Sequence, residues 1–145
     1  MKPGKTGNDF LKRRPCIETV IFSDGGYFMG HTKTSVHFSG SQAVFDTEAL
    51  IPPADGRPVH SEEMTKARFL ARLRSLHIEE WDREYVASNV LDGEQWELEI
   101  RFADGCKPLI ISGDNAYPPH FKSLQRLMTI PAKRKSWRAA CLPVL

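Results

Sequence analysis

The seven residues WELEIRF, 96–102, alternate strictly between apolar and charged side chains. Successive side chains of a β-strand point to opposite faces, so this alternation predicts a strand with one face in the core and the other in water. The buried face would hold Trp96, Leu98, Ile100 and Phe102, and the wet face Glu97, Glu99 and Arg101. Such a strand is typical of an antiparallel sheet that is covered on one side.

The residues after this strand predict a hairpin. Asp104-Gly105 is a tight-turn pair, and KPLIIS, 107–112, is apolar enough to return as the partner strand. Further along, HFKSLQRLM, 120–128, has apolar residues at helical spacing. The chain therefore turns from a second strand into a helix.

The stretch SGDNAYPP, 112–119, joins that strand to that helix and combines a glycine, two polar turn residues and two prolines. It lacks both the glycine-rich phosphate fingerprint and the spaced oxygen ligands of a calcium loop. We interpret it as a structural junction in which Gly113 is left-handed and Asp114 or Asn115 bonds local backbone.

The first half of the chain predicts further strands and one helix. Asp24-Gly25-Gly26 indicates a hairpin turn, and the turn at 39–41 separates two short strands. The proline-rich stretch 51–60 predicts a loop. From Ser61 onward the spacing becomes helical, with Ser61 as the N-cap and two acids after it.

These elements predict an α+β fold: an antiparallel sheet of about five or six strands with two helices packed on one face. One domain would span residues 15–130, because 145 residues are enough for a single core. Residues 1–14 would form a basic N-terminal tail and residues 131–145 a basic C-terminal tail.

The formal charge of +2 conceals an asymmetry. Residues 1–14 carry five cations and one acid, and residues 131–145 carry four cations and no acid, so the body between them has a net charge of −6. The body is acidic and the ends are basic. An acidic body favours a partner with a basic surface, whereas basic ends can bind phosphate backbones.

No local pattern carries a catalytic or metal signature. The five histidines are scattered without H-x-H, H-x-x-x-H or H-E-x-x-H spacing, and a P-loop, a dinucleotide fingerprint and a nucleophile elbow are absent. We therefore expect no cofactor, no metal and no membrane partner, and more plausibly a binding protein than an enzyme. A small enzyme with a site assembled from distant residues stays an open alternative. A cytoplasmic location is expected, since no signal peptide or membrane span is apparent.

EEWDREY, LDGEQWELEIRFADG and ISGDNAYPPHFKSLQRLM, within 78–128, together resemble a small domain of uncharacterised bacterial proteins, many of them associated with mobile elements. The residues that carry the resemblance are Trp81, Tyr85, Trp96, Gly113, Asn115, Tyr117 and Pro118, and all are compatible with architectural roles. The resemblance implies a biological context and no reaction.

Two binding hypotheses follow. The first is a protein-binding module, an inhibitor or accessory factor of a mobile element, that engages a basic, nucleic-acid-processing protein; its partner-binding candidates are Glu79, Glu80, Asp82, Glu97 and Glu99. The alternative is a nucleic-acid-binding protein that uses its basic ends and the arginine face of the first predicted helix. Its candidates are Lys12, Arg13, Arg14, Arg68, Arg72, Arg74, Lys133, Arg134, Lys135 and Arg138.

Overall fold

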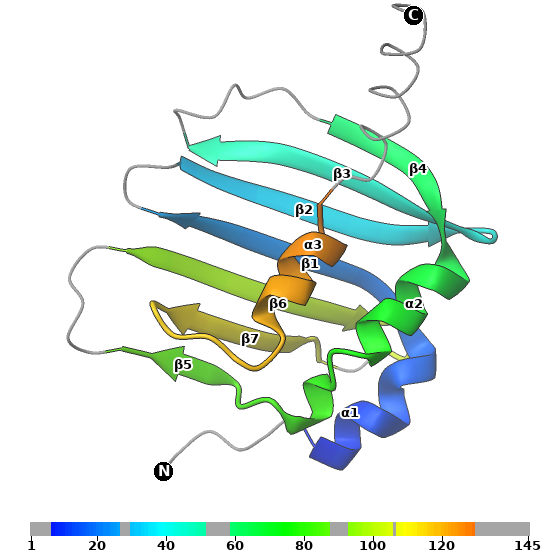
Figure 1. Cartoon of the computed structure of the whole chain (residues 1–145). Coiled ribbons are helices and arrows are strands. Elements are labelled where there is room, and N and C mark those ends of the chain that lie inside the picture. The colour runs from blue at the N-terminus through cyan, green and yellow to red at the C-terminus, as the bar shows by residue number, and fades with distance from the viewer. Residues whose placement is uncertain (1–6, 27–29, 52–58, 88–92, 106, 130–145) are drawn as a thin grey trace, which may run out of the picture.

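The computed structural model describes residues 7–26, 30–51, 59–87, 93–105 and 107–129 (Figure 1). Its strands are β1 (Ile17–Gly26), β2 (Gly30–Ser39), β3 (Gln42–Ile51), β4 (Val59–Thr65), β5 (Glu84–Val86), β6 (Glu94–Phe102) and β7 (Leu109–Asp114). Its helices are α1 (Gly7–Arg13), α2 (Lys66–Arg74) and α3 (Phe121–Leu127), with 3₁₀ turns η1 (Arg14–Cys16) and η2 (Ile78–Glu80). None of these helices is long and apolar enough to cross a membrane.

The seven strands form one sheet in the order β4-β3-β2-β1-β6-β7-β5. The α+β class is confirmed, but the predicted sheet of five or six antiparallel strands is wrong in detail. Edge strand β5 pairs in parallel with β7, so the sheet is mixed. With only three residues, Glu-Tyr-Val, β5 is too short to show a period of its own.

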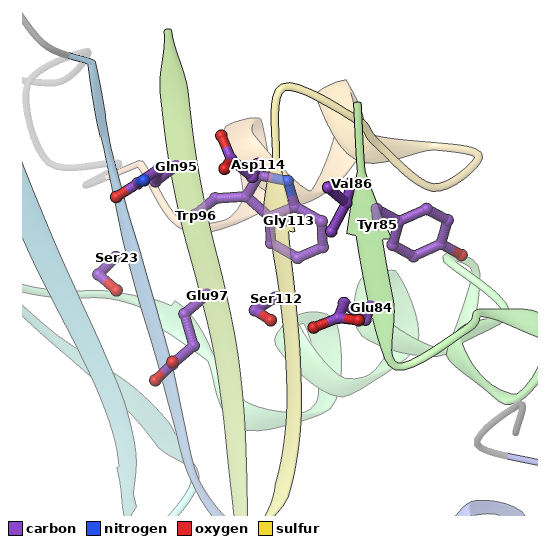
Figure 2. Close-up of a pocket in the computed structure, with 10 residues that line it drawn as sticks. All are labelled: Ser23, Glu84, Tyr85, Val86, Gln95, Trp96, Glu97, Ser112, Gly113 and Asp114. Carbon is purple, nitrogen blue, oxygen red and sulfur yellow. The ribbon is translucent and has the colours of Figure 1, made fainter. Parts of the chain in front are cut away.

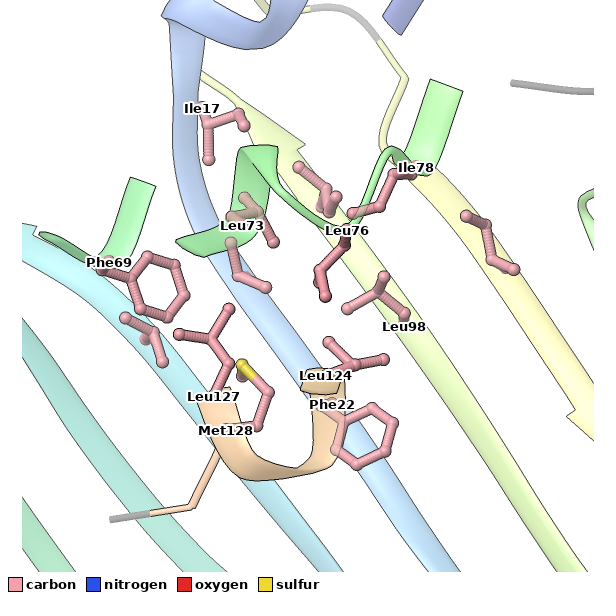
Figure 3. Close-up of a cluster of buried hydrophobic side chains, with 14 of the residues drawn as sticks. Ile17, Phe22, Phe69, Leu73, Leu76, Ile78, Leu98, Leu124, Leu127 and Met128 are labelled. Carbon is pink, nitrogen blue, oxygen red and sulfur yellow. The ribbon is translucent and has the colours of Figure 1, made fainter. Parts of the chain in front are cut away.

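All three helices lie on one face of the sheet, as Figure 1 shows. Three helices rather than the two expected cover this face among the described residues. Apolar side chains of α2, η2 and α3 meet the inward residues of β1 and β6 there, including Leu73, Leu76, Ile78, Leu98 and Leu124, each at most 2% exposed (Figure 3). One contiguous core lies between the sheet and the helices.

Strand β6 confirms the alternation read from the sequence. Trp96, Leu98, Ile100 and Phe102 are buried, whereas Glu97 and Arg101 are exposed and Glu99 is half-buried. Residues Gln95 to Ile100 pair with β7 in the antiparallel hairpin that Asp104-Gly105 predicts. Gly105 has a φ of +77°, the left-handed conformation that the turn requires.

The first predicted turn is wrong. Asp24, Gly25 and Gly26 do not form a turn but belong to β1 and pair with both β2 and β6. Residues 27–29 lie outside the described residues. Pairing on both sides holds Asp24 in the sheet, which local turn propensity alone could not reveal. The next turn is confirmed, with Gly40 at a φ of +59° between β2 and β3.

The predicted helix start at Ser61 is wrong. Ser61 is 3% exposed in β4, opposite Phe45 of β3, and the helix begins only at Lys66. Thr65 is the N-cap, since its side chain accepts a hydrogen bond from the backbone of Arg68 (3.2 Å). The predicted loop 51–60 is also too long, because Ile51 lies in β3 and Val59 in β4; residues 52–58 lie outside the described part.

The described part of the expected N-terminal tail is a packed helix. Phe10 of α1 is 4% exposed and belongs to the core. Arg13 stacks its guanidinium 3.8 Å from the Phe102 ring centroid and donates to the carbonyl of Lys107 (2.7 Å). These contacts tie the start of the chain to the β6–β7 hairpin. Residues 1–6 and the predicted C-terminal tail, 131–145, lie outside the described residues.

Candidate functional site

No helix of the described chain covers the second face of the sheet (Figure 1). We call it the acidic face, because the carboxylates that the strand alternation places on it outnumber its lysines and arginines. They are Asp46 and Glu48 from β3, Glu84 from β5, Glu97 and Glu99 from β6, and Asp114 from β7. Among the described strand residues, its cations are Lys33 and Arg101. The negative excess of the body is therefore concentrated on one surface.

A shallow hollow of about 420 Å³ lies on this face over β1, β6, β7 and β5 (Figure 2). The strand register places Ser23, Glu97, Ser112 and Glu84 in one row across these four strands. Neighbouring strands lie about 4.8 Å apart, so the strands carrying Glu97 and Glu84 are separated by roughly 10 Å, with Ser112 between them. Gln95, Asp114 and Val86 form the adjacent row, and the described lining contains no cation.

Trp96 fixes the floor of the hollow from the other side of the sheet. Its indole lies over Gly113, where a Cβ would come within 2.1 Å of Trp96 Nε1. The indole donates to the carbonyl of Ala116 (3.0 Å) and its ring centroid lies 4.8 Å from that of Phe121. The sequence interpretation gave Gly113 a left-handed role. The structure instead places it in β7, where it makes room for the indole.

Asn115 is the residue that takes the left-handed conformation, with a φ of +58°. Its Oδ1 accepts from the backbone N–H of Glu94 (2.9 Å), and its Nδ2 donates to Asp114 (3.1 Å). The expected bond to local backbone is therefore replaced by a bond to the first residue of β6, 21 positions away. Residues 112–119 thus include the predicted junction between β7 and α3. The bond to Asn115 also holds the start of β6 against the end of β7.

Two basic side chains, His60 and Arg101, bond to carboxylates on or beside the acidic face. His60 bonds Asp46 (2.6 Å) through Nδ1 and Glu62 (2.8 Å) through Nε2, and these hydrogen bonds raise the pKa of the imidazole, the one to Asp46 most. Arg101 donates to Glu99 (2.6 Å). Within the described part of the chain, Glu97 and Glu84 form no ion pair, and both are exposed. The centre of the face thus keeps its charge available.

The structure divides the predicted partner-binding residues into two groups. Glu97 and Glu99 lie on the acidic face. Glu79, Glu80 and Asp82 do not: they belong to η2 and to the segment before β5, and η2 packs beside α1. Glu79 lies 4.0 Å from Arg14, which follows α1.

The predicted nucleic-acid-binding residues are also separated. Arg13 is used by the fold, Arg14 is next to Glu79, and Lys12 is exposed on α1. Arg68 and Arg74 are exposed on α2, while Lys133, Arg134, Lys135 and Arg138 lie outside the described residues. Arg126 of α3, which the sequence did not single out, joins the α2 arginines: burial, then Arg68 and Arg126, lower the pKa of Arg72. No acid of the described chain forms an ion pair with these three.

One group of donor atoms in the described residues is close enough to hold a cation. His77, Glu79 and Glu80 offer atoms that lie within 4.8 Å of one another. His77 Nδ1 lies 3.2 Å from Glu79, and Arg14 approaches the same carboxylate. The carboxylate therefore already has two basic neighbours, and the expectation of no metal stays a prediction.

The sequence interpretation missed Glu84, Asp114, Ser23 and Ser112 as members of the hollow. Strand register brings them together, and register depends on which strands pair. The one signal available was the outward position of Ser112 and Asp114 in the strand that returns after WELEIRF.

Comparison with known proteins adds no assignment. The chain matches no family model, no curated protein and no solved structure.

Proposed function

We propose that this chain is a protein-binding module whose acidic face engages a basic surface of a partner protein. The observation that carries the proposal is the concentration of carboxylates on an uncovered sheet face whose hollow has no lining cation. Charge complementarity then favours a lysine- and arginine-rich partner and steers its approach.

The hollow suits a basic side chain as the anchor of that contact. A lysine or arginine that reaches Ser112 would lie between Glu97 and Glu84, and Val86, 58% exposed, offers apolar contact for its stem. A basic protein surface that normally holds nucleic acid has this chemistry. An inhibitor or accessory factor acting on a nucleic-acid-processing protein is accordingly the form of the function we propose.

The test compares two double variants that each lose two negative charges. The partner is captured with the intact chain from its native host and purified, and its binding is then measured directly across a salt series. Glu84→Gln with Glu97→Gln should slow association at low salt and weaken affinity at least tenfold. Glu80→Gln with Asp82→Asn, which lie off the face, should leave both nearly unchanged. Equal losses in the two variants would show that net charge, and not this face, binds the partner.

A second candidate function rests on the Arg68, Arg72 and Arg126 cluster on the helix side. Three cations without an acidic partner among the described residues could hold a phosphate backbone. Arg72→Gln with Arg126→Gln should then reduce both the affinity for random duplex DNA and the slope of its salt dependence. Arg83→Gln with Lys107→Gln, two exposed cations that are not among the nucleic-acid-binding candidates, is the matched control. Duplex binding that is absent at physiological salt would leave the acidic face as the function.

A further inference from the structure

A second hollow, of about 540 Å³, lies beside α3 on the helix side of the sheet, apart from the acidic face. Tyr117, Pro118 and Phe121 give it an apolar wall. Its polar lining is Glu94, His120, Lys122, Ser123 and Gln125. Concave, largely apolar surfaces with a few convergent polar groups are the usual form of small-ligand sites.

Four elements bring polar side chains together at this hollow. Tyr117 donates its hydroxyl hydrogen to Glu94 Oε1 (2.8 Å), and Gln125 Nε2 of α3 donates to Asp24 Oδ2 of β1 (3.0 Å). Asp24 lies opposite Trp96 in the β1–β6 pair, two positions from Glu94 on the same face, so the two carboxyls are neighbours that influence each other. Asn115 holds the backbone of Glu94. Asp24 and Glu94 thus form a carboxyl pair that is positioned from β1, β6, the junction and α3.

Burial and the neighbouring Glu94 favour the protonated form of Asp24. Together they raise the pKa of this carboxyl to about 7. Asp24 Oδ1 is buried with no hydrogen-bond partner among the described residues. Burial and the bond to Glu94 raise the pKa of Tyr117 to about 12, so its hydroxyl stays protonated and continues to donate. Two neighbouring acids beside an open hollow do not stabilise the fold, so a ligand that binds them better explains their placement.

We propose that this hollow binds a small organic cation, a protonated amine with an apolar or aromatic body, whose charge is taken up by Glu94 and the Asp24 behind it. The apolar body would pack on the rings of Tyr117 and Phe121, whose centroids lie 4.8 Å apart. An ammonium beside these rings gains both the carboxylate and the face of the aromatic quadrupole.

Two consequences follow from the charges that face the pair. A bound cation favours the ionised form of Asp24, so binding near pH 7 releases protons from this carboxyl. Lys122 lines the hollow and is exposed, so its own charge opposes a cationic ligand. His120 also lines the hollow, and Asp114 lies close enough to act on Tyr117. Removing Lys122 should therefore strengthen the binding of a cation and weaken that of an anion.

Calorimetric titration of the full chain with three probes of one shape tests the proposal. They are 2-phenylethylammonium, neutral 2-phenylethanol and anionic phenylacetate. We expect the ammonium to bind at least tenfold more tightly than the other two. At pH 7 its binding enthalpy should differ between phosphate and Tris buffers, because protons are released to the buffer. Equal binding of all three probes, or preference for phenylacetate, overturns the proposal.

Variants locate the site. Glu94→Gln can still accept from Tyr117, so it tests the charge with the contact kept, and it should weaken ammonium binding at least tenfold. Asp24→Asn should bind but remove the buffer dependence. Lys122→Ala should bind the ammonium more tightly, and Glu97→Gln, on the acidic face, serves as the unaffected control. An unchanged affinity in folded Glu94→Gln overturns the assignment. These readouts do not involve the protein partner, so each proposal can fail without the other.

Discussion

The two faces of the sheet carry different residues and, in the function that we propose, have different roles, although the same strands supply both. On the helix-covered face, β6 contributes Trp96, Leu98 and Ile100, all at most 3% exposed. On the acidic face the same strand contributes Glu97, which is exposed and forms no ion pair with another described residue. Stability is therefore concentrated on the first face, and the binding function that we propose would lie on the second. Substitutions that differ by one position along β6 should separate the two properties.

The largest expected effect is that of Trp96→Ala on the free energy of unfolding. Removing an indole that packs on Gly113, Phe121 and Tyr85 should cost about 3–5 kcal/mol. Glu97→Ala, one position later, should change stability by less than about 0.5 kcal/mol. Denaturant unfolding followed by circular dichroism measures both. Similar losses in the two variants would erase the distinction between the faces.

Gly113→Ala sharpens the comparison from the opposite direction, since it adds an atom instead of removing several. The new Cβ would meet Trp96 Nε1 at 2.1 Å and the Ala116 carbonyl at 2.6 Å. We expect a loss of about 1–3 kcal/mol as the indole shifts to avoid overpacking. Gly40→Ala is a useful reference, because its Cβ meets nothing within 4 Å and only backbone strain should be felt. A melting temperature unchanged in Gly113→Ala would contradict the packing described here.

Asn115→Ala should lower stability by about 1 kcal/mol, because the Glu94 N–H loses its acceptor and a left-handed position receives a side chain without a polar group. Asn115→Gly separates the two causes, since it relieves the backbone and still lacks the acceptor. Asp114→Ala should cost less stability, because the Asp114 carboxylate accepts a hydrogen bond from Asn115 alone among the described residues. A larger loss in Asp114→Ala would reverse the assignment of the two junction residues.

A pH dependence of stability is also expected. Because the pKa of Asp24 is raised from 3.8 to about 7, the folded chain binds more protons than the unfolded chain between these values. Stability should therefore fall as pH rises from about 4 to 7 and then stay constant with respect to this group. Asp24→Asn, which stays neutral, should lose that part of the slope. Urea unfolding at pH 5 and pH 8 measures it, and a slope that persists unaltered in the variant would show that Asp24 is not its source.

Local patterns predicted much of the helix-covered face. The strands predicted from WELEIRF and its partner and the helix predicted from the spacing in α3 are confirmed. Each apolar spacing fits only one type of secondary structure. The errors arose where pairing overrides local propensity. Ser61 is of a residue type that favours helix N-caps, yet it lies in the edge strand β4, which pairs with β3. Asp24-Gly25-Gly26 consists of residues that favour turns, yet pairing with β2 and β6 keeps it extended.

The candidate sites were harder to predict than the fold for the same reason. Glu97 could be identified because it lies in a strongly alternating strand. Its neighbours in the hollow, Glu84 and Ser23, can be identified only when it is known which strands pair. The proximity of Asp24 and Glu94 likewise joins residues that are 70 positions apart in the sequence. Phe10 and Arg13 were hidden because basic residues surround them and suggest a tail. Long-range register, not residue type, carried the missing information.

The central position of β1 affects how the chain is made. Synthesis delivers β1 first, and β2 can pair with one of its edges at once. Its other edge has to wait for β6, so this edge stays unpaired until β6 has been synthesised. Only then can α1 dock through Arg13 on the β6–β7 hairpin. The sheet is therefore completed late relative to β1, and a chain stalled before β6 would expose an unpaired, aggregation-prone strand edge.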